Sequence, residues 1–168
     1  MPQIKIREWN EKPRTKLRFI KIGDIFCYQF LEEMFVFGQI LGKVNVGHVI
    51  QFFDFFQVSP TITVEELSHA QFIGKPIIVD SYTLFDRSPV WSWQIIGHQV
   101  DFDPSPFKDL AFKWGDPNGT QFGKVWLDGR TEPKIFSREE VEDLDWEACV
   151  GSIVYNRILE EELDKQMK

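Results

Sequence analysis

Several sequence features are missing or rare in this 168-residue chain, and each of these absences argues against a class of protein. No apolar run approaches the roughly 18–20 residues that span a bilayer, so we expect no membrane partner. The first nine residues, MPQIKIREW, hold no apolar signal segment. The only cysteines, Cys27 and Cys149, are too few and too far apart to suggest a disulfide framework. These features predict a cytoplasmic protein with reduced thiols.

Signatures of catalysis are missing as well. The chain has no Gly-x-Ser-x-Gly, no glycine-rich phosphate loop and no Cys-x-x-Cys, and residues 65–69 lack the second histidine of a zinc-binding helix. Cys149 could in principle act as a nucleophile with His98 as its base, but no local pattern supports that pair. His98 lies at the end of a predicted strand, where a histidine commonly faces solvent or bonds to the backbone. We therefore expect no enzyme, no cofactor and no metal site.

What the chain has in abundance is aromatic residues. They make up 15% of the sequence, with 16 Phe and 6 Trp, a composition that favours strands. Either these side chains fill a core or they build a surface for a partner. The length suits one sizeable core, so we expect a single domain over residues 1–168.

Hydrophobic patterning predicts the elements. A hairpin is expected over 25–30 and 35–42 around a turn with Glu32 and Glu33, and other strands at 16–22, 49–55, 75–80 and 91–97, with 121–127 as the last. Residues 101–119 are rich in turn formers, and 116–119 suit a hairpin turn before that last strand. This predicts an α+β fold, mainly antiparallel, with a strongly curved sheet or a small SH3-like barrel and a few flanking helices.

Helix signals flank the strands. Thr63 precedes two acids and an apolar residue, as at a helix start, and Ser137 with Glu140 forms a capping box. The acidic C-terminal part, 137–168, is expected to end in a helix whose buried face carries Ile153, Val154, Ile158 and Leu159.

Charge is unevenly distributed. The net charge is −7, yet residues 1–23 carry +5 and residues 137–168 carry −6. An acidic protein repels phosphates, and acids flank the aromatic strands, so we expect no nucleic-acid partner. The same acidity suits a basic protein partner, although it could equally serve solubility alone.

The aromatic motifs occur in a recognisable order: 21–26, 35–41, 52–54 and 93–98, followed by Phe112-Lys113 and the turn 116–119. This series resembles the immunity protein 26 family of bacterial polymorphic toxin systems. Members carry a Gly-Asp-Ile/Val-Phe strand, an aromatic-Gly-x-Ile/Val-Leu strand, a Phe-Phe/Tyr-Asp strand and a Trp-x-x-Ile-Gly step. The resemblance spans about residues 16–127 and omits both charged ends.

The resemblance implies an immunity protein that binds the C-terminal effector domain of a cognate toxin and neutralises it by electrostatic and steric blocking of the active site. We expect a monomer or weak dimer. The alternative is a non-catalytic SH3-like module that recognises a peptide or nucleoprotein. The residues matching the family pattern are interpreted as residues that make the fold: Gly23, Asp24, Phe26, Gly38, Phe53, Asp54, Trp93 and Gly97.

Contacts to a basic toxin are expected on accessible acids, because the aromatic strands are needed for the core. Two groups qualify. The turn acids are Glu32, Glu33, Asp101, Asp103 and Asp116. The helix acids are Glu139, Glu140, Glu142, Asp143, Asp145 and Glu147.

Overall fold

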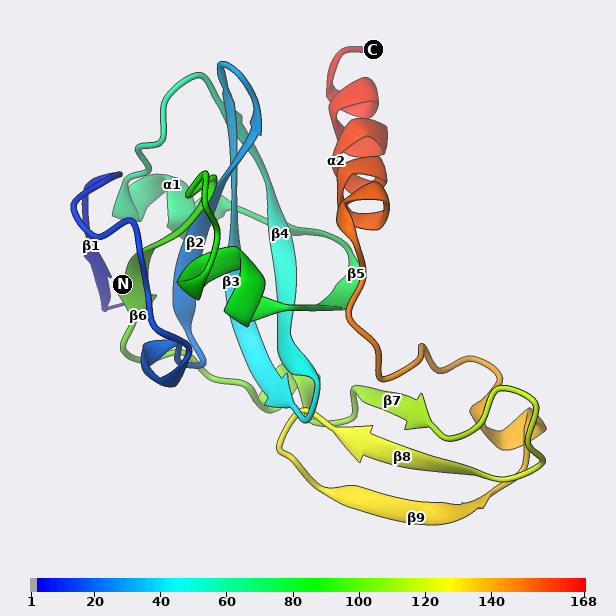
Figure 1. Cartoon of the computed structure of the whole chain (residues 1–168). Coiled ribbons are helices and arrows are strands. Elements are labelled where there is room, and N and C mark those ends of the chain that lie inside the picture. The colour runs from blue at the N-terminus through cyan, green and yellow to red at the C-terminus, as the bar shows by residue number, and fades with distance from the viewer. Residues whose placement is uncertain (1–2) are drawn as a thin grey trace.

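The computed structural model describes residues 3–168, which form two antiparallel sheets and two α-helices (Figure 1). Sheet A has the strand order β1-β6-β2-β3-β4-β5, with bounds Ile4–Ile6, Trp93–Gln99, Asp24–Leu31, Met34–Val44, Gly47–Gln57 and Phe72–Val79. Sheet B has the order β7-β8-β9, with bounds Ala111–Trp114, Phe122–Trp126 and Thr131–Phe136. The helices are α1, Val64–His69, and α2, Ser152–Gln166. Short 3-10 turns occupy Leu17–Phe19, Ser105–Phe107 and Glu139–Val141, and a π-helical turn occupies Tyr82–Asp86.

Strand alternation gives sheet A a buried layer on each face. Along β2, Phe26 and Tyr28 enter one core cluster while Ile25 and Cys27 enter another on the opposite face. This follows from the two-residue period of a strand, which sends successive side chains to opposite sides. The second face is covered by α1, through Leu67. Both faces are covered, which accounts for strands that are apolar almost throughout.

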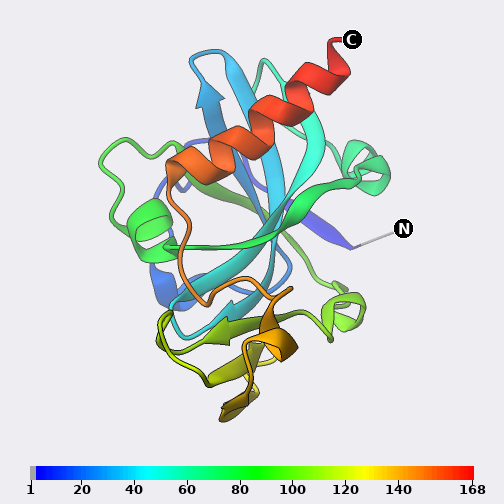
Figure 2. The same ribbon diagram turned by 90° about the vertical axis from the view of Figure 1, so that its right-hand side faces the viewer.

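The first core centres on Trp93, which is 2% exposed. Its ring stacks on Tyr28 at 4.4 Å between centroids and on Phe26 at 5.2 Å. From α2, Tyr155 meets the Trp93 ring edge-on at 5.2 Å, and Leu159 is completely buried in the same cluster. Figure 2 shows α2 running diagonally across this side of the sheet. The aromatic cluster thus holds α2 in place.

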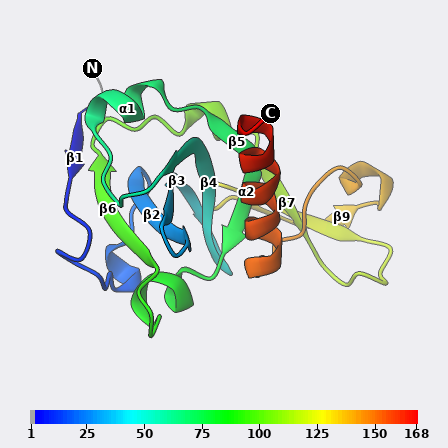
Figure 3. The same ribbon diagram turned by 90° about the horizontal axis from the view of Figure 1, so that it is seen from above.

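Sheet A is strongly curved but open, because its edge strands β1 and β5 do not pair with each other (Figure 3). The expected α+β, mainly antiparallel fold is confirmed, whereas the SH3-like barrel is not formed. Beside the edge strand β5 lies α2 (Figure 3).

Two glycines of the family pattern sit where a side chain would not fit. A Cβ at Gly38 would overlap the Phe26 ring and the Gln51 carbonyl oxygen. Gly23 has a φ of +88°, and a Cβ there would lie 2.9 Å from the Gln99 carbonyl oxygen. Side chains are rarely tolerated at such a φ, so glycine is required for the turn into β2.

A third apolar cluster joins the two sheets. Leu41, Val49 and Ile78 of sheet A pack with Phe112 and Val125 of sheet B, and all five are buried. Sheet B is therefore attached to the end of sheet A by side chains as well as by the chain. The one-domain prediction remains untested, although this shared core is what it would require.

The sequence prediction was wrong for residues 16–22, which do not form a strand. Leu17 begins a 3-10 turn, and its N–H donates to the Asp86 carboxylate at 3.1 Å. The same carboxylate accepts from the Arg14 guanidinium at 2.7 Å. Because β3 and β6 already flank β2, no position beside β2 is left for this segment.

Two strands of sheet B were not predicted. β7 lies inside the segment expected to consist of turns, and β9 follows the strand expected to be last. β9 is mostly exposed and contains Pro133. An exposed edge strand does not need alternating apolar and polar residues, and it tolerates a proline that lacks an N–H donor. The sequence of such a strand therefore gives only a weak strand signal.

The buried face of α2 also differs from the prediction. Tyr155 and Leu159 face the core, while Ile153 is 75% exposed. The helix begins at Ser152, and the contacts of Tyr155 with Trp93 and Tyr28 set its rotation. Position 153 consequently points to solvent.

We predict that Trp93→Ala lowers the free energy of unfolding by about 3–5 kcal/mol, because it opens a cavity among packed rings. Trp126→Ala is the matched control, since Trp126 is only half-buried on β8; it should cost clearly less. Chemical denaturation followed by circular dichroism measures both. Equal losses would contradict the central role assigned to Trp93.

The free energy of unfolding should fall as the pH is lowered, because the buried His48 resists protonation. This side chain is buried, its Nδ1 lies 2.9 Å from the Ser81 hydroxyl, and burial together with the Lys43 charge lowers its pKa to about 4. An unfolded histidine titrates near 6.5, so between these values the unfolded chain binds a proton that the folded chain excludes. This one group should remove about 2 kcal/mol between about pH 7 and about pH 5.

The variant His48→Asn tests this by retaining a polar group without the titration. Its unfolding free energy should depend less on pH than that of the parent protein in the same window. His69→Asn is the control, because His69 is exposed. A parent-like pH slope in His48→Asn would assign the effect to other groups.

Candidate functional site: an apolar cleft beside an acidic segment

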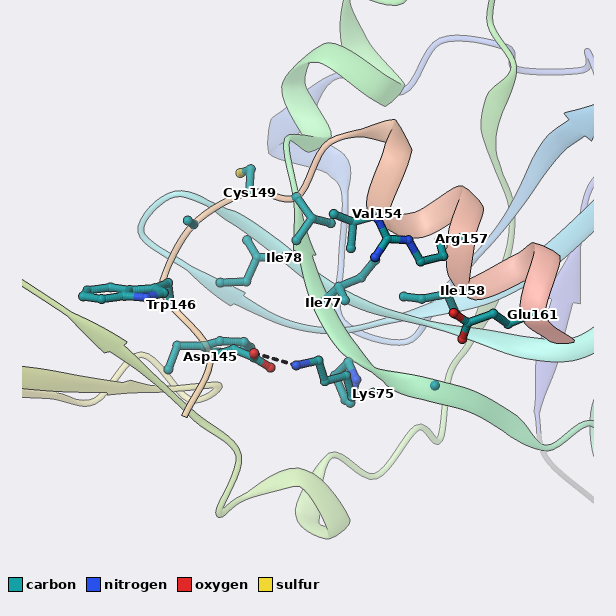
Figure 4. Close-up of a pocket in the computed structure, with 15 residues that line it drawn as sticks. Lys75, Ile77, Ile78, Asp145, Trp146, Cys149, Val154, Arg157, Ile158 and Glu161 are labelled. Carbon is teal, nitrogen blue, oxygen red and sulfur yellow. Dashed lines mark hydrogen bonds and ion pairs between the residues drawn. The ribbon is translucent and has the colours of Figure 1, made fainter. Parts of the chain in front are cut away.

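A well-formed cleft lies where β5, β7 and α2 converge. It measures about 500 Å³. Ile77 and Ile78 of β5 form its floor, Trp146 closes one end, and Val154 and Ile158 of α2 form a wall (Figure 4). Its lining is mainly apolar, as is typical of sites that bury a ligand or a partner side chain.

A charged rim surrounds this apolar lining. Lys75 of β5 reaches across to Asp145, with 2.6 Å between Nζ and Oδ1, and the pair spans the mouth (Figure 4). Arg157 and Glu161 project from successive turns of α2 (Figure 4). Both members of the Lys75–Asp145 pair are substantially exposed, so the pair contributes little to stability and can exchange partners.

The segment 139–147 forms a ridge beside the cleft, and we call it the acidic segment. It contains six acids and no basic residue. It is tied to β7 because the Lys113 N–H donates to the Asp145 carbonyl at 2.8 Å and the Glu147 N–H donates to the Lys113 carbonyl at 2.8 Å. The Lys113 ammonium also donates to the carbonyls of Val141 and Glu142, at 3.1 and 3.2 Å. The backbone of the ridge is thereby held while its carboxylates stay outside.

After the ridge the chain continues along the edge of β5. The Val150 N–H donates to the Ile78 carbonyl at 2.8 Å, and the Cys149 thiol donates to the Val46 carbonyl at 3.1 Å. The bond to Ile78 satisfies part of the open β5 edge of sheet A, and the bond to Val46 reaches the β3–β4 turn. They also place residues 145–150 directly over the cleft before α2 begins.

The helix acids are brought together in the acidic segment, but they are not equivalent. Glu140 accepts the Ser137 N–H at 2.7 Å, and this bond lowers the pKa of its carboxyl. Asp145 is paired with Lys75, and Glu147 accepts the Asn45 N–H at 3.2 Å. Within residues 3–168, Glu139, Glu142 and Asp143 form no ion pair or hydrogen bond through their carboxylates and are exposed.

The turn acids are scattered. Glu32 and Glu33 lie at the β2–β3 turn, whereas Asp101 and Asp103 follow the end of β6, which pairs with the start of β2. The length of β2, roughly 25 Å, therefore separates these two pairs. Asp116 lies on sheet B, where its carboxylate accepts the Asn118 N–H at 2.9 Å. The structure does not assemble the five into one surface.

No catalytic pair forms from Cys149 and His98. The expectation that His98 faces solvent or bonds to the backbone was wrong. Its Nδ1 lies 2.9 Å from the Asp24 carboxylate, in a different pocket. Burial and the charge of Asp80 raise the pKa of the Cys149 thiol, which makes it a poorer nucleophile. Over residues 3–168 there is no cluster of three or more His, Cys, Asp or Glu side chains arranged to hold a metal ion.

The other residues of the family pattern are distributed through the fold. Phe26 and Trp93 lie in the first core, and Phe53 stacks on Phe72 at 5.0 Å. Asp54 accepts the Gln71 N–H at 2.7 Å, which closes the connection around α1. At Gly97 a Cβ would lie 2.9 Å from the Lys5 carbonyl oxygen of β1. None of these residues lines the cleft.

Sequence reasoning missed the cleft itself. Lys75 of β5 is far from Trp146 and Val154 in the chain, and only tertiary packing brings these residues together. The sequence signal that could have pointed to the cleft was Trp146, a large aromatic residue within an acidic stretch.

Comparison with known proteins matches this chain to a family model. The family model for immunity protein 26 covers residues 21–124, which is more than half of the chain. No curated protein and no solved structure matches. The matched range includes β2 to β7 and the β5 side of the cleft, and it ends before the acidic segment and α2. In the part of the chain described, no helix is long and apolar enough to cross a membrane.

The environment of Cys149 leads to a prediction. In the native protein Cys149 should react with iodoacetamide more slowly than an unperturbed thiol at neutral pH, since its pKa is raised. Asp80→Asn should increase that rate by removing one cause of the shift, and Asp109→Asn, an exposed acid elsewhere, should not. Cys27 should react only on unfolding because it is fully buried. Peptide mapping by mass spectrometry distinguishes the two thiols.

Proposed function

We propose that this chain, which belongs to the immunity protein 26 family, binds the effector domain of a cognate bacterial toxin and neutralises it. The match of the family model over residues 21–124 is the observation that carries this proposal. The protein acts in the cytoplasm, by occupying or covering the toxin's active site and without catalysing a reaction. The open sheet differs from an SH3-like barrel, so the geometry does not favour the alternative of a peptide-binding module.

The cleft and the acidic segment together have the composition of a protein interface. Such interfaces have an apolar centre, in which aromatic residues and arginine are enriched, and a polar rim. Here Val154, Ile158 and Trp146 supply the centre, and Arg157 stands beside them. We infer that a toxin side chain or loop inserts into the cleft.

Electrostatics favour a basic toxin domain. The acidic segment concentrates six carboxylates in nine residues, and several of them have no internal partner. A concentrated charge of this kind raises the association rate of an oppositely charged partner and loses its influence as salt screens it. Glu139, Glu142 and Asp143 are the acids best placed to do so. The scattered turn acids are weaker candidates.

The test begins with the effector domain encoded by the toxin gene neighbouring this one. Co-expression of the chain should rescue cells from that domain, and the two purified proteins should form a stoichiometric complex. Effector domains from unrelated toxins serve as the specificity control. Failure to bind or protect against the cognate domain would refute the proposal.

Charge reversal then locates the surface. Glu139→Lys/Glu142→Lys should slow association by about tenfold at low salt and flatten its salt dependence. Glu32→Lys/Glu33→Lys, with the same change of charge on a remote turn, should change the rate much less. Glu140 is left intact because its carboxylate holds the Ser137 N–H. Stopped-flow association across salt concentrations gives both rates, and equal effects would mean that only net charge matters.

A further inference from the structure

A second pocket gathers the positive charge of this acidic protein. It measures about 360 Å³ and lies at the β1 edge of sheet A, and we call it the cationic pocket. Its basic lining residues are Lys5, Arg7, Lys12 and Lys21, and its remaining lining residues are Phe19, Asp24 and His98. It shares no residue with the apolar cleft.

Strand register builds the floor of the cationic pocket. In the β1–β6 ladder Lys5 is opposite His98, and in the β2–β6 ladder Asp24 is opposite His98. Directly opposed residues point to the same face of a sheet, so Lys5, His98 and Asp24 stand in a row across three strands. The row depends on pairing β1, near the start of the chain, with β6.

The carboxylate of Asp24, the acid in this row, already has partners within the protein. The Asp24 side chain is only 6% exposed, and it accepts the Lys21 N–H at 2.8 Å and faces His98 Nδ1 at 2.9 Å. Burial raises the pKa of its carboxyl in spite of these bonds. Holding Nδ1 in this way fixes the imidazole ring and leaves Nε2 for the pocket, as in sites where a carboxylate orients a histidine.

The cations have no such partners. Within residues 3–168, none of the side chains of Lys5, Arg7, Lys12 and Lys21 forms an ion pair. Of the two nearby loop acids, Glu11 accepts the Glu8 N–H at 3.2 Å through its carboxylate, and neither Glu8 nor Glu11 lines the pocket. Four like charges around one concavity repel one another unless an anion joins them.

Phe19 adds an aromatic wall. It is 48% exposed, and the Lys12 ammonium lies 5.7 Å and the Arg18 guanidinium 4.9 Å from its ring centroid. Cations over an aromatic ring are attracted to its face, so Phe19 helps to hold the Lys12 ammonium beside the pocket. An exposed phenylalanine among basic side chains is also a surface on which a planar base can stack.

We propose that the cationic pocket binds a phosphate-bearing polyanion of the diphosphate class. Four basic residues against one committed acid leave an excess of three charges, which a single carboxylate cannot neutralise. The Arg7 guanidinium suits the bidentate geometry of phosphate oxygens, and lysines bind phosphate as point charges. A concave site of this size encloses a small ligand, whereas an acidic peptide would be expected to lie on a flatter surface.

A nucleic-acid backbone also offers phosphate oxygens, but as single phosphodiesters and not as a diphosphate. The binding experiment therefore uses four probes by isothermal titration calorimetry: inorganic pyrophosphate, ADP, a single-stranded RNA hexamer and a hexaglutamate peptide. Pyrophosphate or ADP should bind with a Kd below about 1 mM at low salt and more weakly as salt rises. Tighter binding of pyrophosphate and ADP than of RNA supports a diphosphate site, and the reverse order would contradict it.

Matched variants tie binding to the pocket. Lys5→Gln/Lys21→Gln should weaken it at least about tenfold, because charge-assisted bonds contribute more than neutral ones. Lys108→Gln/Lys168→Gln removes the same charge from exposed positions elsewhere and should change the Kd by less than about twofold. Circular dichroism verifies that each variant is folded.

A second readout reports on the site directly. In nuclear magnetic resonance spectra the ring signals of His98 should shift on titration with pyrophosphate, while those of the exposed His69 should not. The proposal is overturned if pyrophosphate and ADP both fail to bind at about 1 mM, if only RNA or only hexaglutamate binds, or if both lysine pairs weaken binding equally. These outcomes are independent of the toxin, so they separate this proposal from the proposed function.

Discussion

The stacking of Trp93 against Tyr28, with Tyr155 meeting it edge-on, is the contact on which the rest of the architecture depends. Trp93 joins β6 to β2, and Tyr155 joins both to α2. An open, curved sheet leaves one side of its core uncovered, and burial of these rings supplies the free energy that holds α2 over it. The position of α2 then determines where the cleft lies and which of its residues face outward.

The candidate interface is a consequence of that packing. Once α2 is docked, the segment leading to it must return from sheet B along the β5 edge, and bonds to Lys113 and Ile78 hold its backbone. The backbone is satisfied internally, so the carboxylates of the acidic segment remain on the outside. A rigid scaffold thus presents a charged ridge beside an apolar cleft, the arrangement that places a recognition surface without weakening the core.

The negative net charge of the chain conceals two separate charged sites of opposite sign. The acidic segment and the cationic pocket share no element: one lies between sheet B and α2, the other at the β1 edge of sheet A. Local concentrations of opposite sign act over about a Debye length, near 10 Å, so each can attract its own partner in an overall acidic protein.

The sequence by itself determined the hairpin of β2 and β3, the β4 strand, the start of α1 and the α+β class, because apolar alternation and capping residues act locally. Its aromatic motifs also indicated the family.

Tertiary structure alone decided that residues 16–22 turn rather than extend, that Ile153 faces solvent, and that sheet A stays open. It also assembled both sites: Lys75 meets Asp145, and Lys5 stands beside His98, only after distant segments pair. Local patterns specify which residues favour burial or a strand, but which faces meet depends on long-range register and packing, which no short stretch of the chain contains.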